Sequence, residues 1–172
     1  MNLDNKLIVV KTSKNKYLSV IDNAKEFITN EGKFSFSDIK NIPSLIESST
    51  GVVFKIYYPS YKEFVLLMKR GPQIIYPKDV GQIIIEADIH KNSKVLEIGT
   101  GSGALTLYLL NILGSGGSLI SLDINKVNQR RAKKTVERYM STHDFKSEYN
   151  LEFITTSLIE FNYKELSAKI DT

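Results

Sequence analysis

The residues best suited to chemistry in this sequence form a glycine-rich turn. The turn separates an apolar segment predicted to be a buried strand (94–99) from one predicted to be a helix (104–113), and its residues are Gly99, Thr100, Gly101, Ser102 and Gly103. Glycine accepts positive φ angles and lets a ligand approach the backbone without a Cβ in the way. The N–H groups and dipole of the following helix favour an anionic ligand group beside Ala104 and Leu105. The pattern therefore predicts a site for the polar part of a cofactor.

One acid stands where it can complete this site. Asp123 lies twenty residues beyond Gly103, at the end of a second apolar segment (119–124) that predicts a strand. A carboxylate at such a strand end can accept hydrogen bonds from both hydroxyls of a ribose. Asp123 and the neighbouring Ile124 are therefore candidate cofactor-binding residues. Together with the turn, they predict that a nucleoside-containing cofactor lies across the ends of the two strands.

The turn alone does not say which cofactor binds. Its glycines also satisfy the dinucleotide fingerprint of nicotinamide oxidoreductases. Glu97, two residues before Gly99, favours S-adenosylmethionine instead, because an acid there can reach an ammonium group, directly or through water, and would repel a pyrophosphate. A helix predicted over 78–89 precedes the strand and can cover the methionine end. We interpret the site as one for S-adenosylmethionine.

The elements that must position these residues alternate along the second part of the chain. After Arg70 the sequence predicts helices and strands in turn, over 78–89, 94–99, 104–113, 119–124, 126–140 and 151–156. The βαβαβ succession specifies parallel strand pairing with right-handed crossovers. We therefore expect residues 71–172 to form half of a doubly wound α/β domain.

The first 70 residues have a different pattern. Short β-rich segments separated by turn residues predict a small antiparallel sheet or barrel. Ser60–Lys69 is ambiguous, although Ser60 can cap a helix that carries Phe64 and Leu67 on one face. We expect residues 1–70 to be a small β-rich N-terminal domain with its linker. The segments are Lys6–Thr12, Lys16–Ile21, Lys33–Ser37 and Gly51–Tyr58.

Composition narrows the classes of partner. The net charge of +4 arises wholly in residues 1–72, where 11 Lys and Arg stand against 7 Asp and Glu. This excess favours a polyanion such as nucleic acid, although solubilising lysines explain it more simply. Cysteine is absent and His90 and His143 lie far apart, so we expect no metal site. No apolar run is long enough to cross a bilayer and no signal peptide is recognisable, so we expect a cytoplasmic protein with no membrane partner.

Several of these segments resemble one enzyme family. "RGPQIIYPKDVGQII" (Arg70–Ile85), followed by "VLEIGTGSGALTL", resembles the tRNA adenine-N1 methyltransferases that act at position 58 of the T-loop. "SYKEFVLLMKRG" and "GVVFKIYYPS" are also similar to that family. The resemblance covers Lys6 to about Phe161, and its specific part is the Tyr76–Asp79 motif. Whether the adjacent adenine 57 is a second target stays open.

The resemblance implies a fold, a reaction and an assembly. The fold is a Rossmann-like class I S-adenosylmethionine-dependent methyltransferase domain, here with its first three strands, after a small β-rich domain. The partners are tRNA and further copies of the chain, in a homotetramer. Tyr76 takes a substrate-positioning role beside the target adenine. The glycine turn, Glu97 and Asp123 bind the cofactor. The family's usual acid at the end of the third strand is replaced by Ser157, which can still accept a hydrogen bond.

The resemblance also implies a residue that this sequence lacks. The family places a catalytic Asp after its fourth strand, where this chain ends at Asp171 and Thr172. We therefore expect the 172 residues alone to be inactive, and to leave the strand at 94–99 as an unpaired apolar edge.

Three other readings stay open. The chain is also compatible with a non-catalytic subunit that binds S-adenosylmethionine or tRNA, with a methyltransferase for a protein carboxylate or small molecule, and with a nicotinamide oxidoreductase. A basic run on the helix at 126–140 is either a phosphate-binding surface or a solvated face. Its residues are Lys126, Arg130, Arg131, Lys133, Lys134 and Arg138.

Overall fold

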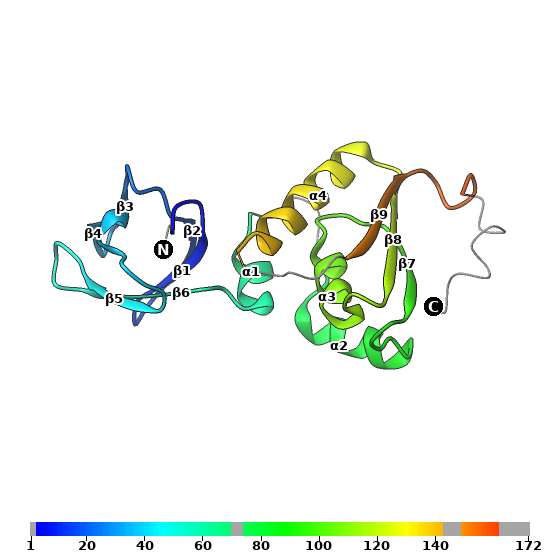
Figure 1. The fold of residues 1–172 in the computed structure, drawn as a ribbon, viewed down its shortest axis with the longest axis horizontal. Helices are drawn as coiled ribbons and strands as arrows, with labels where there is room; N and C mark the ends of the chain where they lie inside the picture. Colours follow the sequence, from blue (N-terminus) through cyan, green and yellow to red (C-terminus); the bar gives the residue numbers. More distant parts are fainter. Residues whose placement is uncertain (1–2, 70–73, 143–148, 162–172) are drawn as a thin grey trace. The chain divides into compact units, whose positions relative to one another are not determined.

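The structure is a computed structural model that describes residues 3–69, 74–142 and 149–161. The chain divides into two compact units, one containing Met1–Met68 and the other containing Lys69–Met140 and the strand that follows. Figure 1 shows the elements of both. The expected boundary at residue 70 lies outside the described residues. None of the described helices is long and apolar enough to cross a membrane.

The first unit is built on antiparallel pairing. Four strands form a sheet in the order β2-β1-β6-β5, and β3 pairs with β4 in a separate hairpin. A 3-10 helix, η1 (Phe36–Asp38), and a short α-helix, α1, complete the unit. The bounds are β1 Leu7–Lys11, β2 Lys16–Val20, β3 Glu26–Thr29, β4 Gly32–Ser35, β5 Ser44–Glu47, β6 Val53–Tyr57 and α1 Tyr61–Leu67.

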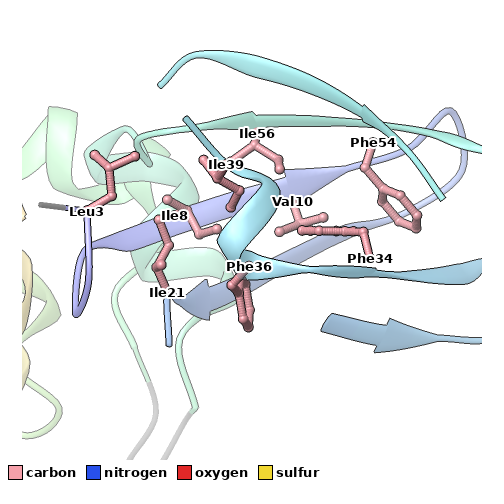
Figure 2. Packing of buried hydrophobic residues seen from close by; sticks show 9 residues of the cluster. All are labelled: Leu3, Ile8, Val10, Ile21, Phe34, Phe36, Ile39, Phe54 and Ile56. Atoms are coloured by element: carbon pink, nitrogen blue, oxygen red, sulfur yellow. The ribbon is translucent and has the colours of Figure 1, made fainter. Parts of the chain in front are cut away.

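The core of this unit lies on one face of the sheet and is closed by the hairpin (Figure 2). Phe34 and Phe54 lie with ring centroids 5.5 Å apart, and Phe27 contacts both. Such aromatic pairs contribute about 0.5–1.5 kcal/mol each beyond the area they bury. Ser60 and Glu63 form a capping box that starts α1, as the sequence predicted for Ser60.

The expected β-rich N-terminal region is confirmed, but two of its strands were missed. β3 and β5 each have only four residues, with a polar or charged residue at each end and two apolar residues between them. Segments this short carry too little periodicity to be recognised from sequence. Their partners in β4 and β6 stabilise them.

The second unit contains a three-stranded parallel sheet in the order β7-β8-β9. Ile98 pairs with Leu122 and Asp123 with Thr155, so the carboxyl ends of the three strands meet at one edge. α3 packs on β8 and on α4, and α4 packs on β8 and β9; Figure 1 shows both helices on the same side of the strands. The bounds are α2 Pro77–Glu86, β7 Lys94–Ile98, α3 Ala104–Leu113, β8 Ser118–Asp123, α4 Lys126–Met140 and β9 Asn150–Thr155.

Candidate cofactor site

The glycine turn joins β7 to α3 at the carboxyl edge of the sheet. All three of its glycines have positive φ: +92° at Gly99, +55° at Gly101 and +80° at Gly103. The backbone N–H groups of Gly99 and Thr100 both donate to Leu122 O, at 2.8 and 3.0 Å. The turn is therefore held against the end of β8, next to the acid that the sequence placed there.

The glycines at the two ends of the turn are needed for different reasons. A Cβ on Gly99 would meet no atom of the described residues within 4 Å, so this side of the turn is open. A Cβ on Gly103 would lie 3.0 Å from Ala132 Cα, where α3 begins against α4. Gly99 thus leaves room for a ligand, whereas Gly103 permits two helices to pack closely.

Asp123 holds the turn from the strand side. Its Oδ2 accepts a hydrogen bond from Gly101 N at 2.9 Å, and its Oδ1 accepts one from Asn125 N at 2.8 Å. Each carboxylate oxygen can accept more than one hydrogen bond. Asp123 is 8% exposed, and the next residue, Ile124, is 77% exposed. The carboxylate and the turn therefore adjoin. Asn128 Nδ2 also donates to Oδ2, at 3.4 Å, so a ligand's hydroxyl groups would share the carboxylate with three protein donors.

The N-terminus of α3 opens onto the same turn. Gly103 is its N-cap and offers no side chain to bond the first N–H groups, and the first turn contains no acidic residue. The N-terminal end of a helix carries a partial positive charge. An anionic group of a ligand would be stabilised beside Ala104 and Leu105.

Glu97 lies beneath the turn and is 5% exposed. Its Oε2 accepts hydrogen bonds from Thr106 Oγ1 at 2.7 Å and Ser121 Oγ at 2.6 Å. Its Oε1 is buried and has no hydrogen-bond partner among the described residues. Burial raises the pKa of Glu97 to about 7, against the hydrogen bonds from Ser121 and Thr106, which lower it.

Buried polar side chains connect Glu97, through Ser121, to Thr100 in the turn and to Gln129 on α4. Thr100 Oγ1 lies 2.6 Å from Ser121 Oγ, and Gln129 Nε2 donates to Thr100 Oγ1 at 2.8 Å. Sequence reasoning missed Thr106, Ser121 and Gln129. Gln129 left one signal, because it lies on the same face of α4 as the buried Ala132, Val136 and Tyr139. Val127, an apolar residue of the same helix, is exposed.

The remaining residues expected in the site have other surroundings. Tyr76 is the N-cap residue of α2 and is 42% exposed. Ser102 is buried within the turn. Ser157 follows β9, and its hydroxyl donates to Glu160 Oε2 at 3.0 Å and accepts from Glu160 N at 3.2 Å. The structure thus brings Glu97, the turn and Asp123 together. Ser157 instead forms its side-chain hydrogen bonds with Glu160.

A groove of about 460 Å³ runs between α4 and β9. We call it the α4/β9 groove. Its charged residues are three cations, Lys126, Arg130 and Lys133, and two acids, Glu137 and Glu152. The rest of its lining is uncharged and mostly apolar. The lining also includes Gln129, Val136, Leu151, Phe153 and Thr155.

Comparisons with known proteins show which family the chain belongs to. Residues 55–171 match the family described as tRNA methyltransferase complex GCD14 subunit. The tRNA (adenine(57)-N(1)/adenine(58)-N(1))-methyltransferase TrmI of Methanocaldococcus jannaschii is 36% identical over 133 residues, which are 77% of this chain and 46% of that protein. The tRNA (adenine(58)-N(1))-methyltransferase TrmI of Thermus thermophilus is 30% identical over 95 residues, 55% of this chain and 37% of that protein. The chain thus spans about half or less of the length of these relatives.

Solved structures show the same fold. A SAM-dependent O-methyltransferase from Thermotoga maritima matches with a TM-score of 0.83 at 20% identity, over 94% of this chain and 60% of that one. The tRNA (m1A58) methyltransferase TrmI from Aquifex aeolicus matches with a TM-score of 0.75 at 24% identity, over 93% and 60%. The expected Rossmann-like methyltransferase fold with a β-rich N-terminal region is confirmed.

Proposed function

Because the chain belongs to the tRNA methyltransferase complex GCD14 subunit family, we propose that it binds S-adenosylmethionine beside the turn between β7 and α3. We further propose that the whole protein methylates N1 of adenine 58 in the T-loop of tRNA. The observation that carries the proposal is the contact between Asp123 and Gly101, which puts a carboxylate against an open glycine turn.

The residues of the turn fit S-adenosylmethionine. Asp123 would accept hydrogen bonds from the ribose hydroxyls. The ligand could approach the backbone of the turn at Gly99, where a Cβ would meet no described atom within 4 Å. The N-terminus of α3 would stabilise the carboxylate of the methionine part. Glu97 would favour the ammonium group through its negative charge rather than by exposed contact, because it is buried.

The chemistry of the transfer is mainly a matter of positioning. When bound, the cofactor would supply an electrophilic methyl carbon on its sulfonium; transfer to N1 of a neutral adenine would break the bond between sulfur and methyl and leave a neutral thioether and a cationic base. The adenine must leave its stack before it can enter a pocket. Tyr76, with its exposed ring at the start of α2, would stack on the unstacked base and offset part of that cost.

The tRNA partner is supported by the charge of α4. Lys126, Arg130 and Lys133 line the α4/β9 groove from one side of the helix. Cations in such a row neutralise backbone phosphates and release counterions. A tRNA substrate agrees with a cytoplasmic location. A family named for a complex subunit agrees with assembly into a complex, and the assembly that we propose is a homotetramer.

Calorimetric titration tests the cofactor assignment. The chain should bind S-adenosylmethionine and not NAD, and Asp123→Ala should weaken binding by roughly 10-fold or more, since a charged hydrogen-bond acceptor is worth about 1.5–3 kcal/mol. Glu86→Ala, on the exposed face of α2, is the matched control. Equal affinity of the two variants, or preference for NAD, would remove the proposal.

A further inference from the structure

A chain of buried hydrogen bonds crosses the second unit beneath the glycine turn. It starts at Gln129 on α4, passes through Thr100 in the turn and Ser121 on β8, and ends at Glu97 on β7. The separations are 2.8, 2.6 and 2.6 Å in that order. All four residues are at most 5% exposed. The chain of bonds therefore lies outside the reach of competing water.

The directions of these hydrogen bonds follow from the acceptors around Gln129 and from the charge of Glu97. Gln129 Nε2 also lies 2.9 Å from Ser121 O and 3.2 Å from Ile154 O, and carbonyl oxygens only accept. The amide nitrogen of Gln129 therefore faces inward, and its two N–H groups are shared among these two carbonyls and Thr100 Oγ1. While Glu97 is an anion its Oε2 only accepts, so Ser121 gives its hydroxyl proton to Glu97 and Thr100 gives its own to Ser121 Oγ.

The surroundings of Glu97 act on the charge of its carboxyl group in opposite directions. Glu97 Oε2 accepts from Ser121 and from Thr106, so any proton on Glu97 sits on Oε1. Two donors stabilise the anion, whereas burial stabilises the neutral acid. The other titratable side chains on the elements around Glu97 are Asp123 on β8, Tyr108 on α3 and the residues of α4, whose Lys and Arg side chains are exposed.

We propose that Gln129 is a positioning residue for cofactor binding: it pins the side chain of Thr100, and with it the turn, and it orients the hydroxyl groups that lie between the turn and Glu97. This inference rests on the proposed function, because the ligand is the one assigned there. Gln129 itself need not touch the cofactor. Its amide nitrogen lies within 3.2 Å of acceptors on the turn, β8 and β9, and its two N–H groups are shared among them.

The proposal predicts a linkage between pH and binding. An anionic Glu97 favours the ligand's ammonium group, so affinity should fall as pH drops through the pKa of Glu97, near 7. Without Gln129, the hydroxyl groups of Thr100 and Ser121 are free to turn away. The anion then loses stabilisation, the pKa of Glu97 rises, and the pH midpoint of binding moves upward.

Gln129→Met tests this, since it keeps the approximate volume and removes the donor. Binding of S-adenosylmethionine to the full chain is titrated from pH 5.5 to 8.5, and the pKa of Glu97 is followed without ligand by carbon-13 NMR of its carboxyl carbon. Glu97→Gln assigns that signal and isolates the contribution of Glu97, because titration of the ligand's own amine is common to all variants. We expect roughly 5-fold weaker binding at pH 7.5, in line with a lost buried hydrogen bond, and an upward shift of the pKa of Glu97.

Two further variants keep the test decisive. Val136→Ala lies on the same buried face of α4 and should lower stability without moving the pKa of Glu97. Ser121→Ala breaks the chain of bonds with the loss of one hydroxyl, and should raise that pKa even if Gln129→Met does not fold. An unchanged pKa in every folded variant that breaks the chain would overturn the inference. If the variants show the pKa shifts of Glu97 but the wild-type chain binds no S-adenosylmethionine, the proposed function is overturned instead.

Discussion

Replacing Gly103 with alanine tests whether this glycine serves packing rather than ligand binding. A Cβ there would lie 3.0 Å from Ala132 Cα and 3.1 Å from its Cβ. An L residue in the left-handed region costs about 1–2 kcal/mol, and overpacking costs about 1–3 kcal/mol more. The smaller freedom of the unfolded chain offsets about 0.4–1 kcal/mol. We expect the free energy of unfolding to fall by roughly 3 kcal/mol.

Gly99→Ala is the matched comparison. Gly99 has a similar φ, +92°, but a Cβ there would meet no described atom within 4 Å. Only the backbone strain remains, so the loss of stability should be roughly 1 kcal/mol. Urea unfolding followed by the helical circular dichroism signal measures both variants, since most of the helix lies in the second unit.

Binding should reverse the order of the two variants. The Cβ of Gly99→Ala enters the open side of the turn, so this variant should lose more affinity for S-adenosylmethionine than a folded Gly103→Ala. Equal losses of stability, within about 0.5 kcal/mol, would refute the assignment of Gly103 to helix packing.

Three further predictions concern charge. Burial raises the pKa of Glu97 from 4.5 to about 7, so the native state holds this proton more tightly than the unfolded chain. The free energy of unfolding should therefore fall by up to about 3 kcal/mol as pH rises from 4.5 to 7. Thermal unfolding of Glu97→Gln should lack that decline. The pKa of Glu63 is shifted in the opposite direction. Burial raises it, but hydrogen bonds from Lys16, Tyr57 and Ser60 outweigh burial and lower the pKa to about 2. Its stabilisation is complete above pH 4.5 and is lost toward pH 2, so Glu63→Gln should cost about 1 kcal/mol at pH 7 and little at pH 2, in thermal melts of the first unit. Replacing the three cations of the α4/β9 groove with alanine should weaken tRNA binding and reduce its salt dependence by about three phosphate contacts; a filter-binding salt series with an unchanged slope would exclude the groove as an RNA surface.

Much of the second unit could be predicted because its signals are local. The bounds of α3 and α4 agree with the predicted ranges, 104–113 and 126–140, since apolar periodicity and the flanking turn residues mark both ends. The glycine turn and Asp123 were found for the same reason, as residue types at short, regular spacing. By contrast, β3 and β5 depend on their partners in β4 and β6, and four residues carry no reliable period.

The sequence by itself determined the parallel order of elements and the residues at the carboxyl ends of β7 and β8. Only the tertiary structure decided which of them touch. Gln129 reaches Thr100 across 29 positions, and Glu97 reaches Ser121 across 24, because parallel pairing and the packing of α4 bring these distant segments together. A buried polar group must find a partner wherever the fold places one, and no spacing along the chain shows where that will be.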